Sequence, residues 1–112
     1  MTDETGGLPE PNPWHPMRDP ADIRHLGKLL EELGECTAAV SRCLIQGIDE
    51  HEPVTGKPNR QWLREELADV LANVRLVANR FFVEELDMIE VRAAKKQQQL
   101  QKWHAMVEDH RT

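Results

Sequence analysis

The chain has 112 residues, of which 14 are basic and 20 acidic, and it carries a formal net charge of −6. Its 39% hydrophobic and 30% charged residues are typical of one small globular domain. The acidic balance argues against nucleic acid as a partner, because binding to phosphate backbones relies on Lys and Arg. No apolar run approaches the roughly 18 residues of a membrane span and the start lacks signal-peptide order, so we expect a cytoplasmic protein without membrane contact.

The first segment is rich in proline. Five of the seven prolines lie in the first 20 residues, which prevents a regular helix there. We therefore predict an extended N-terminal arm over residues 1–19, which could pack on the body or cover a substrate site. Residues 20–112 are predicted to form a single all-α domain.

Three helices are predicted in this domain. Asp19 and Pro20 are typical of a helix start, and Gly47 can end the first helix. After a loop over 48–58, Asn59 can cap a second helix that runs to about Arg80, and a third follows a break near 82–84. Apolar or small residues recur every three or four positions in the first helix, which indicates one continuous row. The members of this apolar row are Ile23, Leu26, Leu30, Leu33, Thr37, Val40 and Leu44.

The predicted helices are too long for one short chain to bury all of their apolar faces. Helices of about 20 to 27 residues measure roughly 30 to 40 Å at 1.5 Å per residue. We therefore predict an all-α fold of antiparallel helical bundles, in which four-helix bundles are completed by homo-oligomerisation as a dimer or tetramer.

Acidic residues cluster at two places in the predicted helices. In the first helix Glu31, Glu32 and Glu35 fall within an arc of about 100° beside the apolar row. In the second helix Glu66 and Asp69 lie about 60° apart on one face. If the two helices pack antiparallel, these carboxylates meet at one edge of the seam.

Carboxylates brought together in this way repel one another. Each pair at 4 Å costs on the order of 1 kcal/mol in water and about 4 kcal/mol at an effective dielectric of 20. Mg²⁺ or Mn²⁺ would offset this repulsion, since both ions favour carboxylate and water ligands. The alternative is that both acidic stretches are solvated helix faces. Gly34 favours the metal site, because a helical glycine costs about 1 kcal/mol and indicates close approach of a helix or ligand.

The two acidic stretches resemble a known motif. Glu32-Leu-Gly-Glu35 and Glu66-Leu-Ala-Asp69 are similar to the E-x-x-E and E-x-x-D pair of the MazG-like all-α nucleoside triphosphate pyrophosphohydrolases. The similarity covers residues 23–80, about half of the chain. It implies hydrolysis of a nucleoside triphosphate, with a deoxynucleoside triphosphate favoured, to the monophosphate and pyrophosphate in control of the nucleotide pool. Glu32, Glu35, Glu66 and Asp69 would then hold Mg²⁺, with Mn²⁺ as a possible substitute.

The same resemblance implies roles for neighbouring residues. Glu35 and Glu31 are the expected catalytic residues, with Glu31 as the candidate general base. Lys28 is expected either to contact phosphate or to pair with Glu32 one turn away. Asn73 is expected either to bind the sugar or base or to be a polar residue at the bundle seam.

A different class of function fits the same helices. A non-catalytic helical-bundle protein could use the acidic seam to bind a partner. A redox bundle with two iron ions is disfavoured, because the sequence contains no Glu-x-x-His motif. Base and sugar preference stay open at this stage.

Overall fold

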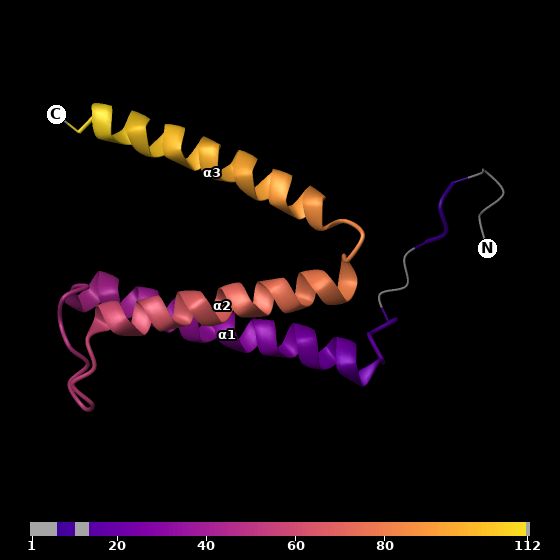
Figure 1. Cartoon of the computed structure of the whole chain (residues 1–112), viewed down its shortest axis with the longest axis horizontal. Coiled ribbons are helices and arrows are strands. Elements are labelled where there is room, and N and C mark those ends of the chain that lie inside the picture. The colour runs from indigo at the N-terminus through magenta and orange to yellow at the C-terminus, as the bar shows by residue number, and fades with distance from the viewer. Residues whose placement is uncertain (1–6, 11–13, 112) are drawn as a thin grey trace.

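The computed structural model describes residues 7–10 and 14–111. The regular elements of these residues are three helices (Figure 1). The helices are α1 (Pro20–Gln46), α2 (Asn59–Phe81) and α3 (Leu86–Asp109). The described residues contain no strand, and the one β-type pairing among them is an isolated bridge between His51 and Pro58. The all-α prediction is thus confirmed.

Helix α1 begins and ends at the predicted residues. The Asp19 side chain accepts hydrogen bonds from the backbone N–H groups of Ala21 and Asp22, and Pro20 occupies the first helical position. Gly47 ends the helix with a φ of 107°, a conformation that favours glycine, and its N–H donates to the Cys43 carbonyl.

The start of α2 differs from the prediction. Asn59 is the first residue of the helix, and no side chain caps it. The Asn59 side chain instead donates from Nδ2 to the Gly47 carbonyl at 2.9 Å, and only 1% of the residue is exposed. The prediction of an Asn59 cap is wrong because this side chain joins the start of α2 to the end of α1.

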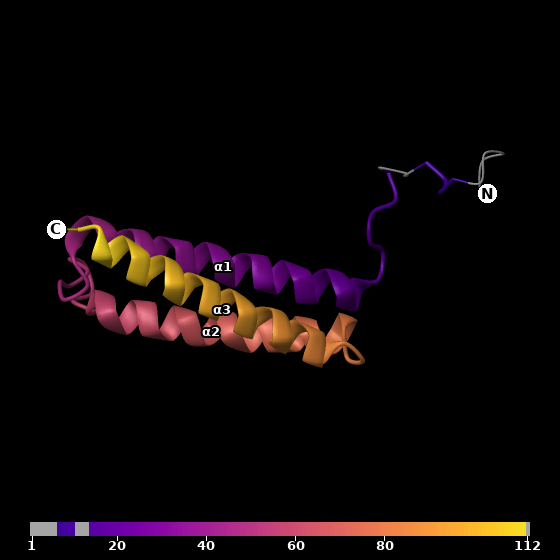
Figure 2. The same cartoon turned by 90° about the horizontal axis from the view of Figure 1, so that it is seen from above.

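Helices α1 and α2 lie side by side and antiparallel (Figures 1 and 2). The most buried residues of this pair are small or polar: Ala39 and Glu32 on α1, and Asn59 and Ala78 on α2. Small side chains let the two backbones approach closely. The apolar row of α1 lies mostly outside this contact, with Leu30 72% and Leu44 82% exposed.

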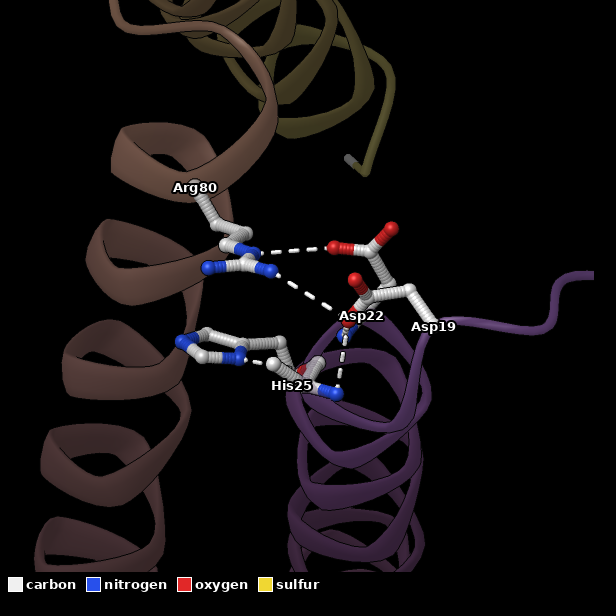
Figure 3. Close-up of polar contacts among 5 residues, drawn as sticks. Asp19, Asp22, His25 and Arg80 are labelled. Carbon is white, nitrogen blue, oxygen red and sulfur yellow. Dashed lines mark hydrogen bonds and ion pairs between the residues drawn. The ribbon is translucent and has the colours of Figure 1, made fainter.

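An ion-pair cluster joins the opposite end of the pair (Figure 3). Arg80, near the end of α2, donates from Nε to Asp22 Oδ1 at 2.8 Å. The same guanidinium lies 3.4 Å from Asp19 Oδ1, the oxygen that caps α1. Arg80 therefore connects the last turn of α2 to the first turn of α1.

Helix α3 stands apart from the pair. It leaves α2 through the turn at Phe82–Glu85 and diverges toward its C-terminus (Figure 1). Seen from above it runs over the pair, between α1 and α2 (Figure 2). None of its residues is buried.

The predicted N-terminal arm lies partly outside the described residues, which omit 1–6 and 11–13. Residues 7–10 and 14–19 form no helix and are exposed, and Trp14 is 84% exposed. No helix in the described part of the chain is long and apolar enough to cross a membrane.

Candidate metal and nucleotide site

Three glutamates from two helices meet at the α1–α2 seam. One carboxylate oxygen each of Glu32, Glu35 and Glu66 lies within 4.8 Å of the other two. Glu32 and Glu35 are successive on one face of α1 because they are three positions apart, and Glu66 approaches them from the antiparallel α2. The fold thus assembles a three-carboxylate cluster from segments separated by the 47–58 loop.

Glu32 is the most enclosed member of this cluster. Only 8% of the residue is exposed, and its Oε2 atom is buried without a hydrogen-bond partner. Burial, followed by repulsion from Glu35 and Asp69, raises the pKa of the Glu32 carboxyl above its usual value. A buried carboxylate oxygen without a partner is costly unless a cation or a proton neutralises it.

Glu66 has a similar environment on α2. Its Oε2 atom is buried and accepts no hydrogen bond. Burial raises the pKa of the Glu66 carboxyl, and the charges of Asp69 and Glu32 raise it further. Two glutamates of the cluster, from different helices, therefore each have a buried carboxylate oxygen without a partner.

Asp69 lies beside the three-carboxylate cluster, on the exposed side of α2. It is not one of the three side chains whose oxygens fall within the 4.8 Å limit. Its charge nevertheless acts on both Glu32 and Glu66, raising the pKa of each. Asp69 therefore lies near the cluster without being one of its three members.

Lys28 is the cation nearest to Glu32 among the ion pairs of the described chain. Its Nζ atom lies 3.3 Å from Glu31 Oε1 and 3.7 Å from Glu32 Oε1. Because the Lys28 side chain is 56% exposed, these pairs provide only weak compensation. One half-exposed ammonium does not offset the charge of Glu32, Glu35 and Glu66.

A pocket lies next to Lys28, whose ammonium is 3.7 Å from Glu32 Oε1, although none of the three clustered glutamates lines it. It has a volume of about 470 Å³, which is within the range of small-molecule sites. The residues that line it are Arg24, His25, Gly27, Lys28, Glu31, Asn73 and Leu76. The two predicted substrate contacts, Lys28 on α1 and Asn73 on α2, thus line the same pocket.

Asn73 and Glu31 also make contacts within their own helices. Asn73 Nδ2 donates to the Asp69 carbonyl at 2.8 Å, which holds the amide one turn beyond the acidic cluster. Glu31 is half-exposed at the pocket wall, where it pairs with Lys28.

Two cationic or titratable residues of this pocket, Arg24 and His25, were not predicted from the sequence. Arg24 precedes Lys28 by four positions, the spacing that places side chains on one helix face. That spacing could have identified Arg24. His25 also lines the pocket, and its Nδ1 atom donates to the Ala21 carbonyl at 2.7 Å.

A second group of cations lies near the loop end of the seam. The Lys57 ammonium is 4.9 Å and the Arg42 guanidinium 5.9 Å from the centre of the Trp62 ring. Lys57 also pairs with Glu65 and lowers the pKa of that carboxyl. The acidic cluster therefore has positive side chains at both of its ends.

Gly34 does not play the expected role within the chain. A Cβ atom built at this position would meet nothing within 4 Å. The expected close approach of a helix is thus absent from a single copy of the chain, because Gly34 points away from α2.

Comparison with known proteins identified no relative of this chain. No family model matches the sequence, and no curated protein or solved structure is significantly similar to it. The features of this chain that point to a function are therefore its two acidic motifs and the geometry of the seam.

The donor set fits a hard divalent cation. All the clustered side chains offer carboxylate oxygens, which are the ligands that Mg²⁺ and Mn²⁺ prefer. The unpartnered Oε2 atoms of Glu32 and Glu66 are available to bind such an ion. Cysteine is absent from the cluster, so the site does not resemble a structural zinc centre.

Proposed function

We propose that this protein is a Mg²⁺-dependent nucleoside triphosphate pyrophosphohydrolase of the MazG-like type. The observation that carries the proposal is the buried Glu32 carboxylate, whose Oε2 atom lacks a partner beside Glu35 and Glu66. Glu32, Glu35, Glu66 and Asp69 are the proposed ligands of Mg²⁺, with Mn²⁺ as a substitute. Bound Mg²⁺ would supply charge neutralisation for the triphosphate and polarisation of its α-phosphoryl group.

The pocket beside the cluster is the proposed nucleotide site. Arg24 and Lys28 supply positive charge on α1 for phosphate oxygens. Asn73, on the α2 side, offers an amide that can both donate and accept hydrogen bonds with the sugar or base. A deoxynucleoside triphosphate is the favoured substrate.

Glu31 is the proposed general base. Its carboxylate is half-exposed at the pocket wall, where it could accept a proton from an attacking water molecule. Water would add to the α-phosphorus as the bond to the bridging α–β oxygen breaks. The products are a nucleoside monophosphate and pyrophosphate, consistent with a cytoplasmic role in nucleotide-pool control.

In this proposal the protein acts as a homo-oligomer, either a dimer or a tetramer. Its many exposed large hydrophobic side chains support association, since large contiguous apolar patches are uncommon on monomers.

The test is an assay of the purified full chain with Mg²⁺ and a panel of ribo- and deoxyribonucleoside triphosphates. We expect pyrophosphate and monophosphate as products. Glu35→Gln and Asp69→Asn should each lower kcat/KM at least about 100-fold, since even substitutions around a metal ligand cost 10- to 100-fold. Glu84→Gln, in the exposed turn before α3, serves as the charge-matched control and should keep full activity.

Two outcomes would reject the proposal. One is release of orthophosphate instead of pyrophosphate. The other is full activity in both ligand variants with unchanged helicity by circular dichroism. Absence of turnover with every nucleotide, despite saturable Mg²⁺ binding, would favour the non-catalytic interaction protein.

A further inference from the structure

Two cationic side chains lie over the Trp62 ring at the loop end of the α1–α2 seam. The Lys57 ammonium is 4.9 Å and the Arg42 guanidinium 5.9 Å from the centre of this ring. Arg42 belongs to α1 and Lys57 to the loop before α2, so the two cations come from different parts of the chain. The ring therefore holds together two positive charges that would otherwise repel each other. Neither cation lines the nucleotide pocket.

The Arg42 guanidinium has no polar partner in the described part of the chain. It donates no hydrogen bond there and forms no ion pair, although the side chain is only partly exposed. The nearby Glu52 carboxylate accepts its hydrogen bonds from Val54 and Thr55 instead. A planar guanidinium placed on an aromatic ring without a carboxylate partner is suited to an oxyanion, which it can bind through two parallel N–H groups.

Lys57 extends from the loop toward the acidic cluster. Its ammonium pairs with Glu65, the residue before the cluster member Glu66. Burial raises the pKa of the Glu66 carboxyl, and the Lys57 charge partly opposes this shift. Lys57 is thus close enough to act on the cluster electrostatically. Its side chain is 32% exposed, so the ammonium is accessible from solvent.

The two cations and the nucleotide pocket lie at opposite ends of the three-carboxylate cluster. On α1, the pocket residue Lys28 lies seven positions before Glu35, and Arg42 lies seven positions after it. Seven residues are about two turns, so the three side chains share one face at intervals of about 10 Å. Helical side chains tilt toward the N-terminus, which directs Arg42 back toward Glu35. On α2, Trp62 precedes Glu66 by one turn on the same face.

We propose that Arg42 and Lys57 bind the β- and γ-phosphates of the nucleotide and hold the pyrophosphate that leaves. This inference rests on the proposed function and adds a direction to it. The nucleoside lies in the pocket at Lys28, the α-phosphoryl group lies at the carboxylates, and the pyrophosphate lies at the loop. As water adds to the α-phosphorus, its proton goes to Glu31. The bond to the α–β bridging oxygen breaks, and the electron pair stays on the pyrophosphate, whose charge the two cations offset.

The chemistry of this end of the seam favours a polyanion over a nucleobase. Both cations lie over the Trp62 ring, which is the surface on which a base would stack. Lysine and arginine side chains are hydrogen-bond donors only, and ionised phosphate oxygens are acceptors. The chain as a whole carries a net charge of −6 and repels polyanions, so a local pair of cations is needed to hold one.

The test is a calorimetric titration of the full chain with pyrophosphate in excess Mg²⁺. Arg42→Gln and Lys57→Gln should each weaken pyrophosphate binding at least about 10-fold, since a hydrogen bond between charged groups contributes that much. Lys57→Arg keeps the charge and should keep most of the affinity. Arg60→Gln is the matched control, because Arg60 lies at the same end of α2 but pairs with the exposed Asp49. It should bind pyrophosphate as the wild type does.

A second titration tests the direction of the nucleotide. A deoxynucleoside monophosphate contains only the part of the substrate that is assigned to the pocket. Lys28→Gln should weaken its binding and leave the affinity for pyrophosphate nearly unchanged. Arg42→Gln and Lys57→Gln should do the reverse. Circular dichroism and thermal denaturation verify that each variant is folded.

Three outcomes would overturn the inference. The first is a wild type that does not bind pyrophosphate, or that binds it no more tightly than Arg42→Gln and Lys57→Gln. The second is equal weakening by Arg60→Gln, which would show a general effect of charge. The third is loss of monophosphate binding instead of pyrophosphate binding in Arg42→Gln and Lys57→Gln, which would place the nucleoside at the loop. Because no titration requires turnover, failure of the catalytic proposal alone would appear separately, as intact pyrophosphate binding without hydrolysis of any nucleotide.

Discussion

At the scale of single residues, the main feature is the burial of the Glu32 carboxylate, which is energetically unfavourable. Glu32 is buried, one of its oxygens has no partner, and its pKa is raised by burial and by Glu35 and Asp69. A raised pKa means that folding disfavours the charged form, so ionised Glu32 lowers the stability of the metal-free protein at neutral pH. Such a cost is typical of functional sites.

Glu32→Gln should therefore raise the melting temperature in EDTA, because it removes the buried charge and its repulsions. In wild type, Mg²⁺ should raise the melting temperature by binding the folded state, and this response should disappear in Glu32→Gln. Thermal denaturation with EDTA and with Mg²⁺ measures both effects. A variant that is destabilised in EDTA, or that keeps the full Mg²⁺ response, would contradict the assignment of Glu32 as a ligand.

A second residue-scale feature lies in the 47–58 loop. Glu52 accepts hydrogen bonds from the Thr55 hydroxyl at 2.6 Å and from the backbone N–H groups of Val54 and Thr55 at 2.9 and 2.6 Å. The Thr55 hydroxyl contributes most, and together these donors lower the pKa of the Glu52 carboxyl from 4.5 to about 2. The ionised Glu52 thus holds the loop that connects α1 and α2.

The stabilisation from Glu52 should depend on pH. A lowered folded-state pKa contributes stability that is complete above pH 4.5 and is lost as the pH falls toward 2. Glu52→Gln should therefore melt at a lower temperature than wild type at pH 7, and the difference should shrink toward pH 2. Glu50→Gln, at a neighbouring exposed position, is the control. If the difference in melting temperature between wild type and Glu52→Gln stayed constant with pH, it would come from lost packing and not from the lost charge.

At the scale of elements, the helices are joined at both ends by polar contacts. Asn59 connects α2 to the end of α1, and Arg80 connects the end of α2 to the capping residue Asp19 and to Asp22. The Arg80 contacts span about 60 residues of chain and fix the register of the pair. This register sets which carboxylates of the two helices meet.

Arg80→Gln should destabilise the protein by on the order of 1 kcal/mol, because partly exposed ion pairs contribute about that much. A loss of this size lowers the melting temperature of a small domain by a few degrees. Arg64→Gln, on an exposed side of α2, should have little effect. The difference in melting temperature between the two variants should become smaller at high salt. An equal decrease in melting temperature in both variants would exclude a specific role for Arg80.

At the scale of the whole molecule, the chain separates two kinds of surface. The carboxylate cluster and its pocket lie on one side of the α1–α2 pair, and uncharged aliphatic rows with α3 lie on the other. Self-association through the aliphatic side would complete a core without enclosing the candidate site.

The sequence by itself determined the three helices and both ends of α1. Residue spacing and local signals specify them, including Asp19 with Pro20 at the start of α1 and Gly47 at its end. Spacing also placed Glu32 with Glu35 on one helix face and Glu66 near Asp69 on another. These features depend on residues a few positions apart, so they can be derived without knowledge of the fold.

Only the tertiary structure decided which helix faces meet. It selected the side of α1 with Glu32 and Ala39 for contact with α2 and left the apolar row open. It also brought His25 into the pocket and joined Arg80 to Asp19. The physical reason is that several faces of α1 offer comparable apolar or small surfaces. The choice among them depends on contacts between residues distant in sequence, which local patterns do not encode.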